Sequence, residues 1–453
     1  MDITSIKRLH LDFADIDSNK SYEAYDVDKN YHIITLYLNK EENVACPYCN
    51  SKNIVSRGTK SNEFEYSIPN EKRIFVKLYR YVYKCSNCNK YFKQNNPFTS
   101  ANHKISEATN LEILNALKDK TRTFTSVANE YNVSPTYVIN LFDRRVSLKR
   151  GYLPEVLAID EVYSKRLTST KYCCILYAPR WRKIIDVLKC RQKNYLIDYF
   201  SRIPLEEKNR VLFISIDMYM PYREALRLCF PNAIIACDSF HVIKQLQARF
   251  NSIRIRVMRK YEKNKKTDLD YRIYKKFFKL LLVSEDKIPI NYITVLKDQV
   301  KMTGDQIISH MLSLDKELTT AYYLKQKYRE FNLTVTYDKA QTKLEDLIEE
   351  FKACGIKEYA SFWKLLVQWK IEIINSFHIY KNKRISNGPM EAINDQIKTI
   401  FKVSNGNTNF TRTRNRIMYS LNENTSILSS PKEKTNKAEG KKRGKYKKIK
   451  TNN

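Results

Sequence analysis

The sequence predicts a multidomain chain: a four-cysteine ribbon, an all-α unit, a mixed α/β domain with a helical insertion, and a basic, disordered tail. Three observations predict this order. Two Cys-x-x-Cys pairs lie in the first hundred residues, three amphipathic helices follow, and apolar strands ending in aspartate come next. The 453 residues exceed the ~250–300 that one hydrophobic core supports. We therefore place domains at 1–100, 101–150 and 151–425, an insertion at about 257–380, and a tail at 426–453.

Composition restricts the class of protein. Lys and Arg number 81 against 49 Asp and Glu, so the formal net charge is +32. This excess points to a polyanionic partner, most simply nucleic acid. No apolar run approaches the ~18 residues of a membrane span, which excludes an integral membrane protein. The first residues lack the pattern of a secretion signal, so we expect a cytoplasmic protein.

Four of the ten cysteines form two tight pairs, Cys46-x-x-Cys49 and Cys85-x-x-Cys88. Two such turns can supply the four thiolates of a structural zinc site. The 35 residues between the pairs include a strand-like segment, Arg73–Tyr83, so we expect a zinc ribbon with an extended hairpin. Disulfides or free thiols are the alternatives, and disulfides are disfavoured without a secretion signal. The remaining cysteines lie in apolar segments and are interpreted as core residues.

Three helices are expected next, at Glu107–Asp119, Thr123–Tyr131 and Pro135–Arg145. Ser134 is a suitable N-cap, and proline suits the first position of a helix. Three helices with a tight turn before the last are typical of a helix-turn-helix that binds DNA. A helical linker with a solvated polar face is the alternative. The residues expected to face a major groove are Ser134, Thr136, Tyr137, Asn140 and Arg144.

After residue 155 the pattern becomes mixed α/β. The order is three strands, helix, strand, helix, strand and a long helix, as in the RNase H-like fold. The expected strands are Val156–Asp160, Tyr172–Ala178, Lys183–Leu188, Arg210–Asp217 and Ala233–Asp238, and the helices are Gln192–Phe200, Pro221–Phe230 and His241–Arg256. Residues 257–380 read as helices throughout, including one amphipathic segment, Ser361–Phe377. A further helix begins at Met390, and the Lys-rich end from Pro431 reads as disordered.

Acidic residues end the apolar strands at Asp160, Asp217 and Asp238, and Glu391 lies in the late helix. Carboxylates that converge at the carboxyl edge of a sheet can hold two divalent metal ions at a phosphate. Magnesium prefers such oxygen ligands. Each acid also has a structural interpretation, because the aspartates could cap turns and Glu391 could favour the positive end of its helix.

Several segments together resemble the insertion-sequence transposases of the ISL3 family. These segments are the four cysteines, Ile159-Asp160-Glu161, Ser215–Tyr222, Ala236–Lys244, Ser386–Asn394, Ile397-Lys398, and Asn409-Phe410 with Arg414 to Arg416. The likeness covers roughly residues 40–425, in the order of the family. It implies a zinc ribbon, a helix-turn-helix and an RNase H-like catalytic domain with an Asp-Asp-Glu triad.

At the positions that match the family motifs, the resemblance implies that Asp160, Asp217 and Glu391 form the catalytic triad and bind Mg²⁺ or Mn²⁺. Asp238 and His241 match a neighbouring segment and would support the site. Glu161 is expected on the opposite face of its strand and is left out of the triad. Asp395, one turn after Glu391, is a reserve candidate.

The resemblance also implies an activity and its partners. The protein would bind the terminal inverted repeats of its element, cleave the strand, and join the 3′ end to target DNA. It would act as a homodimer or larger assembly in the bacterial cytoplasm, with the nucleoid. Two alternatives remain open: a catalytically inactive DNA-binding regulator, and a nuclease without strand transfer.

Overall fold

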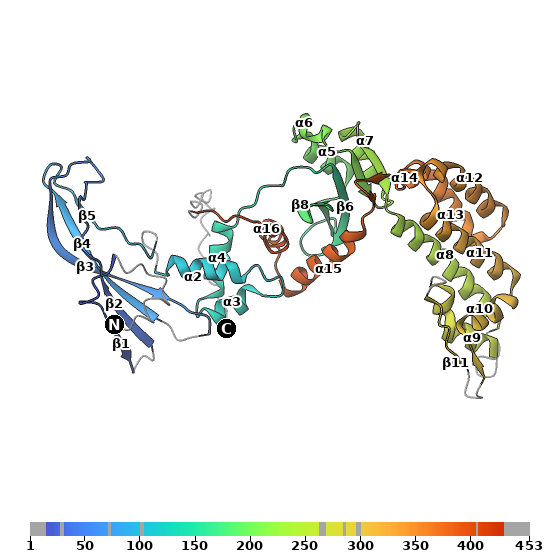
Figure 1. Cartoon of the computed structure of the whole chain (residues 1–453), viewed down its shortest axis with the longest axis horizontal. Coiled ribbons are helices and arrows are strands. Elements are labelled where there is room, and N and C mark those ends of the chain that lie inside the picture. The colour runs from blue at the N-terminus through green and yellow to red at the C-terminus, as the bar shows by residue number, and fades with distance from the viewer. Residues whose placement is uncertain are drawn as a thin grey trace, which may run out of the picture. The chain divides into compact units, whose positions relative to one another are not determined.

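The computed structural model describes residues 15–27, 31–70, 74–99, 104–261, 269–283, 287–295, 300–404 and 406–429 (Figure 1). Contacts divide the chain into two compact units. The described parts of residues 1–149, 399–405 and 411–453 form unit 1, and those of residues 150–398 and 406–410 form unit 2. The expected tail from Pro431 lies outside the described residues. Within these ranges, no helix is both long and apolar enough to span a bilayer.

Unit 1 begins with a sheet in the order β1-β2-β4-β3, and β5 pairs with β4. β2 and β4 are parallel, and the other pairs are antiparallel. The long β3–β4 hairpin includes the strand expected at Arg73–Tyr83, and its inner face packs Phe64, Val76 and Leu78. The strands are β1 (Tyr22–Asp26), β2 (Tyr31–Tyr37), β3 (Ile54–Tyr66), β4 (Ile74–Cys85) and β5 (Tyr91–Lys93).

The three helices of unit 1 lie where the sequence predicts them. They are α2 (Glu107–Ala116), α3 (Phe124–Glu130) and α4 (Pro135–Arg145). Ser134 caps α4, since its side chain accepts a hydrogen bond from the Tyr137 backbone N–H at 3.1 Å. Val127 and Phe142 are fully buried between these helices.

A fourth helix, α16 (Phe410–Leu421), belongs to this cluster from residue 411 onward. We expected this segment in the α/β domain, and the structure places it in unit 1 instead. Tyr419 enters the helical core and donates its hydroxyl to the Leu114 carbonyl at 3.0 Å. The buried Arg416 guanidinium donates to the carbonyls of Asp119 and Arg122. These contacts join residues about 300 positions apart, which no local pattern reveals.

Unit 2 contains a mixed sheet in the order β10-β9-β6-β7-β8. β6 pairs parallel with β9, and β9 with β10, whereas β7 is antiparallel to both β6 and β8. The prediction of a mixed α/β domain is confirmed. The strands are β6 (Val156–Tyr163), β7 (Tyr172–Ala178), β8 (Lys183–Leu188), β9 (Phe213–Ile216) and β10 (Ile234–Cys237).

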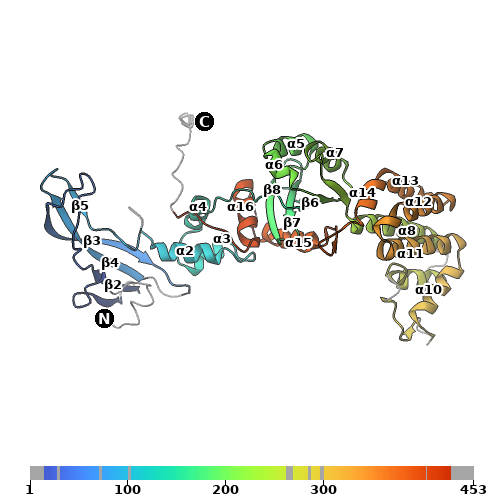
Figure 2. The same ribbon diagram turned by 45° about the horizontal axis from the view of Figure 1, so that its top comes forward.

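Three helices lie on one side of this sheet in both views (Figures 1 and 2). They are α5 (Lys193–Ser201), α6 (Leu205–Asn209) and α7 (Met220–Cys229). Leu157 and Ile159 of β6 face the buried Phe200 and Tyr222 in one core. Because side chains alternate along a strand, Asp160 is directed to the other face.

An insertion of helices follows β10 and is mostly helical, as expected. Its helices are α8 (Ser239–Lys260), α9 (Leu269–Phe277), the 3₁₀ helix η3 (Phe278–Leu281), α10 (Gly304–Ser313), α11 (Lys316–Thr334), α12 (Tyr337–Ala353), α13 (Lys357–Gln368) and α14 (Lys370–Asn375). Two details differ from the prediction. A short hairpin, β11 (Ile293–Thr294) and β12 (Lys301–Met302), interrupts the helices. The segment expected as one helix breaks at Trp369, whose ring is buried in the core between α13 and α14.

The chain then returns to the sheet. The two-residue strands β13 (Ile379–Tyr380) and β14 (Lys383–Arg384) form a hairpin, and α15 (Gly388–Val403) follows, beginning two residues before the predicted start. Phe213 of β9 contacts Tyr380 of β13, and Asn375 donates to the Ile235 carbonyl of β10. The fold therefore brings the start of α15 to the strands that carry the candidate acids.

Candidate metal and active sites

The two Cys-x-x-Cys pairs form matching turns in unit 1. Each second cysteine is followed by an asparagine with positive φ, Asn50 at 56° and Asn89 at 56°. Asparagine tolerates this left-handed conformation better than most residues. The Cys46 N–H donates to the Ser51 carbonyl, and the Cys85 N–H donates to the Lys90 carbonyl, both at 3.0 Å. Each turn is thus closed by its own backbone.

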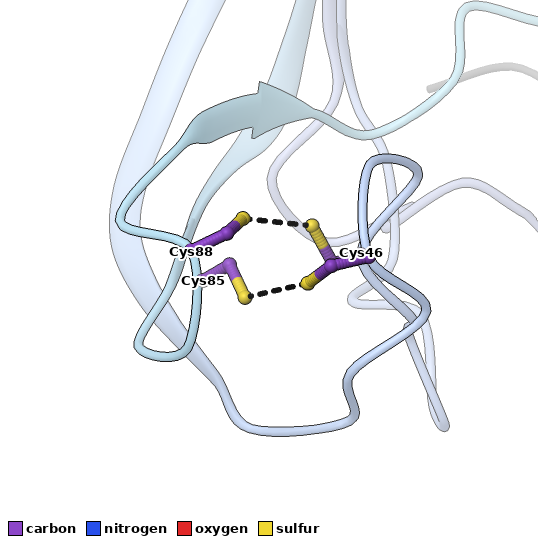
Figure 3. A group of neighbouring side chains, drawn as sticks. Cys46, Cys85 and Cys88 are labelled. Atoms are coloured by element: carbon purple, nitrogen blue, oxygen red, sulfur yellow. Dashed lines mark hydrogen bonds between the residues drawn. The ribbon is translucent and has the colours of Figure 1, made fainter.

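The two turns bring four sulfur atoms together (Figure 3). The Sγ atoms of Cys46 and Cys88, and those of Cys49 and Cys85, are 3.6 Å apart. A disulfide would require about 2.05 Å. Four sulfurs at ~2.3 Å from one zinc ion would be roughly 3.8 Å apart, so the cluster fits zinc. The N–H of Cys88 lowers the pKa of the Cys85 thiol to about 6, whereas burial and the neighbouring thiols raise the pKa of Cys88 to about 11 although the Lys90 N–H opposes this shift. Without a metal, the cluster therefore favours a thiolate at Cys85 and a thiol at Cys88.

The residues expected to face DNA on α4 divide into two groups. Ser134, Thr136 and Asn140 are exposed. Tyr137 and Arg144 are partly buried. The Tyr137 hydroxyl donates to Asn110 Oδ1 of α2 at 2.6 Å, and burial raises its pKa to about 12. Tyr137 therefore holds two helices together.

Three carboxylates meet at the carboxyl edge of the unit 2 sheet. Ala158 of β6 pairs with Ser215 of β9 in parallel register. Asp160 and Asp217 each lie two residues further on, so the parallel strands deliver them side by side. Carboxylate oxygens of Asp160, Glu161 and Asp217 all lie within 4.8 Å of one another. This proximity of three acids suits a hard divalent cation.

The surroundings of Asp217 support that interpretation. Its Oδ1 atom is buried and has no hydrogen-bond partner. Burial first, and then the charges of Glu161 and Asp160, raise the pKa of Asp217 to about 8, although Arg191 opposes the shift. A buried carboxylate oxygen without a partner, facing two other acids, is costly unless a cation neutralises it. The donor set therefore fits magnesium or manganese.

Glu161 was expected on the opposite face of its strand from Asp160, and its carboxylate nevertheless reaches the two aspartates. Its carboxylate accepts from the Tyr222 hydroxyl of α7 at 3.2 Å and forms an ion pair with Arg191. The Arg191 guanidinium lies over the rings of Tyr172 and Tyr219, at 4.1 and 4.3 Å from their centroids. Alternation fixes the face from which a side chain leaves, but a glutamate at a sheet edge is long enough to reach the neighbouring acids.

Glu391 is exposed on α15 and is not part of the carboxylate cluster. The same helix nevertheless docks on Asp160. Asn394 Nδ2 donates to Asp160 Oδ2 at 2.7 Å, and both side chains are buried. Asn387 Nδ2, just before α15, donates to the Ile159 carbonyl at 3.2 Å. Both asparagines stand in the Ser386–Asn394 segment, but only its glutamate was singled out from the sequence.

Asp238 and His241 lie close to this helix start. Asp238 is 4% exposed, and its Oδ1 accepts from the Asn387 backbone N–H at 3.3 Å. His241 Nε2 is 3.9 Å from Asp238 Oδ2. Asp238 thus holds the turn that precedes α15. The reserve candidate Asp395 is exposed and pairs with Lys398 at 2.9 Å, away from the cluster.

Comparison with known proteins identifies the family. A search of curated proteins finds no match to this sequence. A family model described as a transposase, of the ISL3 type, matches residues 157–417. The matched segment runs from β6 into α16 and contains the carboxylate cluster, the helical insertion and α15. Because the match covers more than half of the chain, this protein belongs to the ISL3 family of transposases.

Proposed function

We propose that this transposase binds the terminal inverted repeats of an insertion sequence and catalyses metal-dependent DNA strand cleavage and strand transfer. The observation that carries the proposal is the proximity of the Asp160 and Asp217 carboxylates, of which the buried Asp217 Oδ1 has no hydrogen-bond partner. The sheet order, with only β7 antiparallel, is that expected of an RNase H-like catalytic domain. In this domain the acids lie at the sheet edge where ligands of open α/β sheets usually bind.

Asp160 and Asp217 are proposed as the ligands of Mg²⁺ or Mn²⁺. When bound, such ions would activate the attacking oxygen and stabilise the leaving oxygen at a phosphate. Asn394 holds Asp160 in place by donating to one carboxylate oxygen, which leaves lone pairs on that group for a cation. Arg191 offsets the negative charge of Glu161 at the rim.

Two phosphoryl transfers account for the activity. In cleavage, a water oxygen attacks phosphorus and loses its proton to solvent, the bond from phosphorus to the 3′ oxygen breaks, and the departing 3′ oxygen takes up a proton to become a hydroxyl. In joining, this 3′-hydroxyl loses its proton and attacks a target phosphate in line, the target bond from phosphorus to its 3′ oxygen breaks, and that oxygen takes up a proton. Each step forms one P–O bond and breaks one, so no oxidant or reductant is needed.

Glu391 is proposed as the third member of the triad. It precedes Asn394 by three residues on α15, which corresponds to about one turn and roughly 4.5 Å of rise. Since Asn394 touches Asp160, this spacing keeps Glu391 on the helix face that approaches the acids. Its exposed side chain is free to turn inward when a cation and DNA arrive. Glu161 is the competing third ligand, and mutation distinguishes the two.

The N-terminal unit is proposed to recognise the element ends. The four cysteines would hold structural zinc, and α4 would serve as the recognition helix of a helix-turn-helix. Its exposed Ser134, Thr136 and Asn140 can reach base edges or phosphates, and Arg144 remains a candidate phosphate contact. Paired ends require two active sites, so we propose a homodimer or larger assembly on DNA, in the bacterial cytoplasm with the nucleoid.

The test is a Mg²⁺-dependent cleavage and joining assay on DNA from both flanks of the gene, with Asp160→Asn as the variant. The proposal predicts cleavage at discrete ends and joined products for the wild type, and binding without cleavage for the variant. Binding without cleavage by both proteins would indicate the inactive regulator. Cleavage that never yields joined products would indicate a nuclease.

A further inference from the structure

The distal part of the helical insertion carries a row of basic side chains on α9 and η3. Arg272, Lys275, Lys276 and Lys279 follow the spacing i, i+3, i+4 and i+7, which places them on one helix face. All four are exposed, while Tyr271, Ile273, Tyr274 and Phe277 are buried on the opposite face. We call the four basic residues the α9 basic row.

The row is a surface of one charge. None of its members forms an ion pair with a described carboxylate. The acid on the same helix, Asp270, is engaged by His310 at 2.9 Å. Lys276 Nζ lies 3.4 Å from the Thr294 carbonyl of β11, so the hairpin borders the row, and the exposed Lys301 stands opposite Thr294. Exposed basic residues without acidic partners attract a polyanion.

Other exposed lysines of the insertion are arranged differently. On α12, Lys339 and Lys343 share the exposed surface with Glu345, Asp346 and Glu349. Such mixed charge gives little net attraction for a polyanion. The comparison separates the α9 basic row from the general excess of lysine in the chain.

The row also has a defined position along α8. Tyr274 contacts Tyr261 with ring centroids 5.9 Å apart, Phe278 lies under Arg254 at 4.8 Å, and Gln247 donates to the Leu282 carbonyl at 3.4 Å. α9 and η3 therefore run antiparallel to α8, toward its N-terminus (Figure 1).

The N-terminus of α8 lies at the carboxylate site, because Asp238 precedes it and holds the turn beside Ile159 and Asp160. At ~1.5 Å per residue, Arg254, which lies over Phe278 next to the near end of the row, is roughly 22 Å and Tyr261 roughly 33 Å along α8 from Ser239. With ~3.4 Å per base pair, this range corresponds to about seven to ten base pairs of duplex DNA.

We propose that the α9 basic row is a second DNA-binding surface, which contacts the phosphate backbone of duplex DNA about seven to ten base pairs from the reacting phosphate. It reads no sequence, since lysines and an arginine on an open helix face meet phosphates as point charges. The inference rests on the proposed function in its choice of DNA as the polyanion.

The test measures binding of the full-length protein to a duplex by fluorescence anisotropy across a salt series, without added Mg²⁺. The variant replaces Arg272, Lys275, Lys276 and Lys279 with alanine. Each lost phosphate contact lowers the slope of log affinity against log salt by about 0.9, so the slope should fall by up to about 3.6. We expect at least a tenfold loss of affinity near 0.1 M salt.

Two controls make this result specific. The matched control replaces four exposed lysines of α12 and α13, Lys339, Lys343, Lys352 and Lys364, with alanine, and changes the net charge equally. It should leave the slope nearly unchanged. A charge-retaining variant, Arg272→Lys with Lys275→Arg, Lys276→Arg and Lys279→Arg, should keep wild-type affinity. If this variant keeps wild-type affinity, the weaker binding of the alanine variant results from its lost charge and not from unfolding of α9.

Equal slopes for the wild type and the α9 alanine variant would overturn the inference, and so would equal losses in the α9 and α12 variants. Shortening the duplex arm next to the cleaved phosphate below about seven base pairs should weaken binding by the wild type and leave binding by the α9 variant unaffected. A wild type that shows these slopes but never cleaves DNA would contradict the proposed function alone.

Discussion

The cysteine cluster and the carboxylate cluster are built in opposite ways. Each cysteine pair sits in a turn that its own backbone closes, and the two turns flank one long hairpin. The carboxylates come from β6 and β9, and the helix that contacts Asp160 follows more than 170 residues after Asp217. The first site is largely local in sequence, whereas the second exists only once the sheet and α15 have assembled.

The two clusters also share a feature in their titration without metal. The Cys88 N–H lowers the pKa of Cys85 to about 6, whereas burial and the neighbouring thiols raise the pKa of Cys88 to about 11 although the Lys90 N–H opposes this shift. Burial and neighbouring acids raise the pKa of Asp217 to about 8, so a carboxylate there is disfavoured at neutral pH. In each cluster, a cation must therefore displace protons from ligands that hold them.

The largest expected effect follows from removal of a cysteine. Cys85→Ser should abolish zinc binding and unfold the β3–β4 region, because structural zinc contributes about 10–16 kcal/mol in zinc-finger peptides. Hydrogen exchange should show lost protection in unit 1 and normal protection in the sheet of unit 2. Partly exposed Cys190 lies in unit 2 and offers the control, since Cys190→Ser should change neither the zinc content nor the exchange in unit 1. Full zinc content in Cys85→Ser would show that Cys85 is not a zinc ligand and would contradict a structural role for the cysteine cluster.

Removal of an acid should separate stability from activity. Asp217→Asn should lower the cleavage rate by at least about 1,000-fold, because a metal ligand is lost. Because the pKa of Asp217 is raised to about 8, the metal-free protein already favours the neutral acid at pH 7, and a neutral amide at this position should leave the Tm of the Mg²⁺-free protein the same or higher. Calorimetry beside the cleavage assay checks both. A lower Tm together with lost cleavage would mean that Asp217 is structural.

The third effect concerns Asn394, which positions Asp160. Asn394→Ala should lower Mg²⁺ affinity and cleavage by about 10- to 100-fold, as expected for a residue that orients a metal ligand. Excess Mn²⁺ should restore part of the activity. Asp395→Asn, on the exposed side of the same helix, should behave as the wild type. Equal Mg²⁺ affinity in Asn394→Ala and the wild type would remove Asn394 from the site.

The smallest effect is a pH dependence. The pKa of Asp217 is raised from 3.8 to about 8, so its proton stabilises the folded, metal-free protein below pH 3.8, and that contribution is lost as the pH rises toward 8. A cation must displace this proton, so apparent Mg²⁺ affinity should rise up to about tenfold per pH unit until about pH 8. Titration calorimetry at pH 6, 7 and 8 measures this. A pH-independent affinity would contradict the raised pKa of Asp217.

The sequence predicted features that depend on local patterns and missed those that depend on contacts between distant segments. The cysteine pairs, the helix α4 with its Ser134 cap, and the strands of the unit 2 sheet depend on local patterns, and the structure has them at nearly the expected bounds. The contacts of Glu161, α16 and Tyr137 could not be predicted from the sequence. Each depends on a contact with a distant segment, such as the Tyr137 hydroxyl with Asn110. Periodicity predicts the face of an element but not which segment will cover it.

The identity of the third carboxylate tests the central claim most directly. Mg²⁺-dependent cleavage of the flanking DNA should be measured for the wild type, Glu391→Gln and Glu161→Gln, with DNA binding measured in parallel. The account predicts that all three bind DNA, that Glu391→Gln does not cleave, and that Glu161→Gln retains substantial cleavage. Full cleavage by Glu391→Gln together with none by Glu161→Gln would contradict it and assign the third position to Glu161.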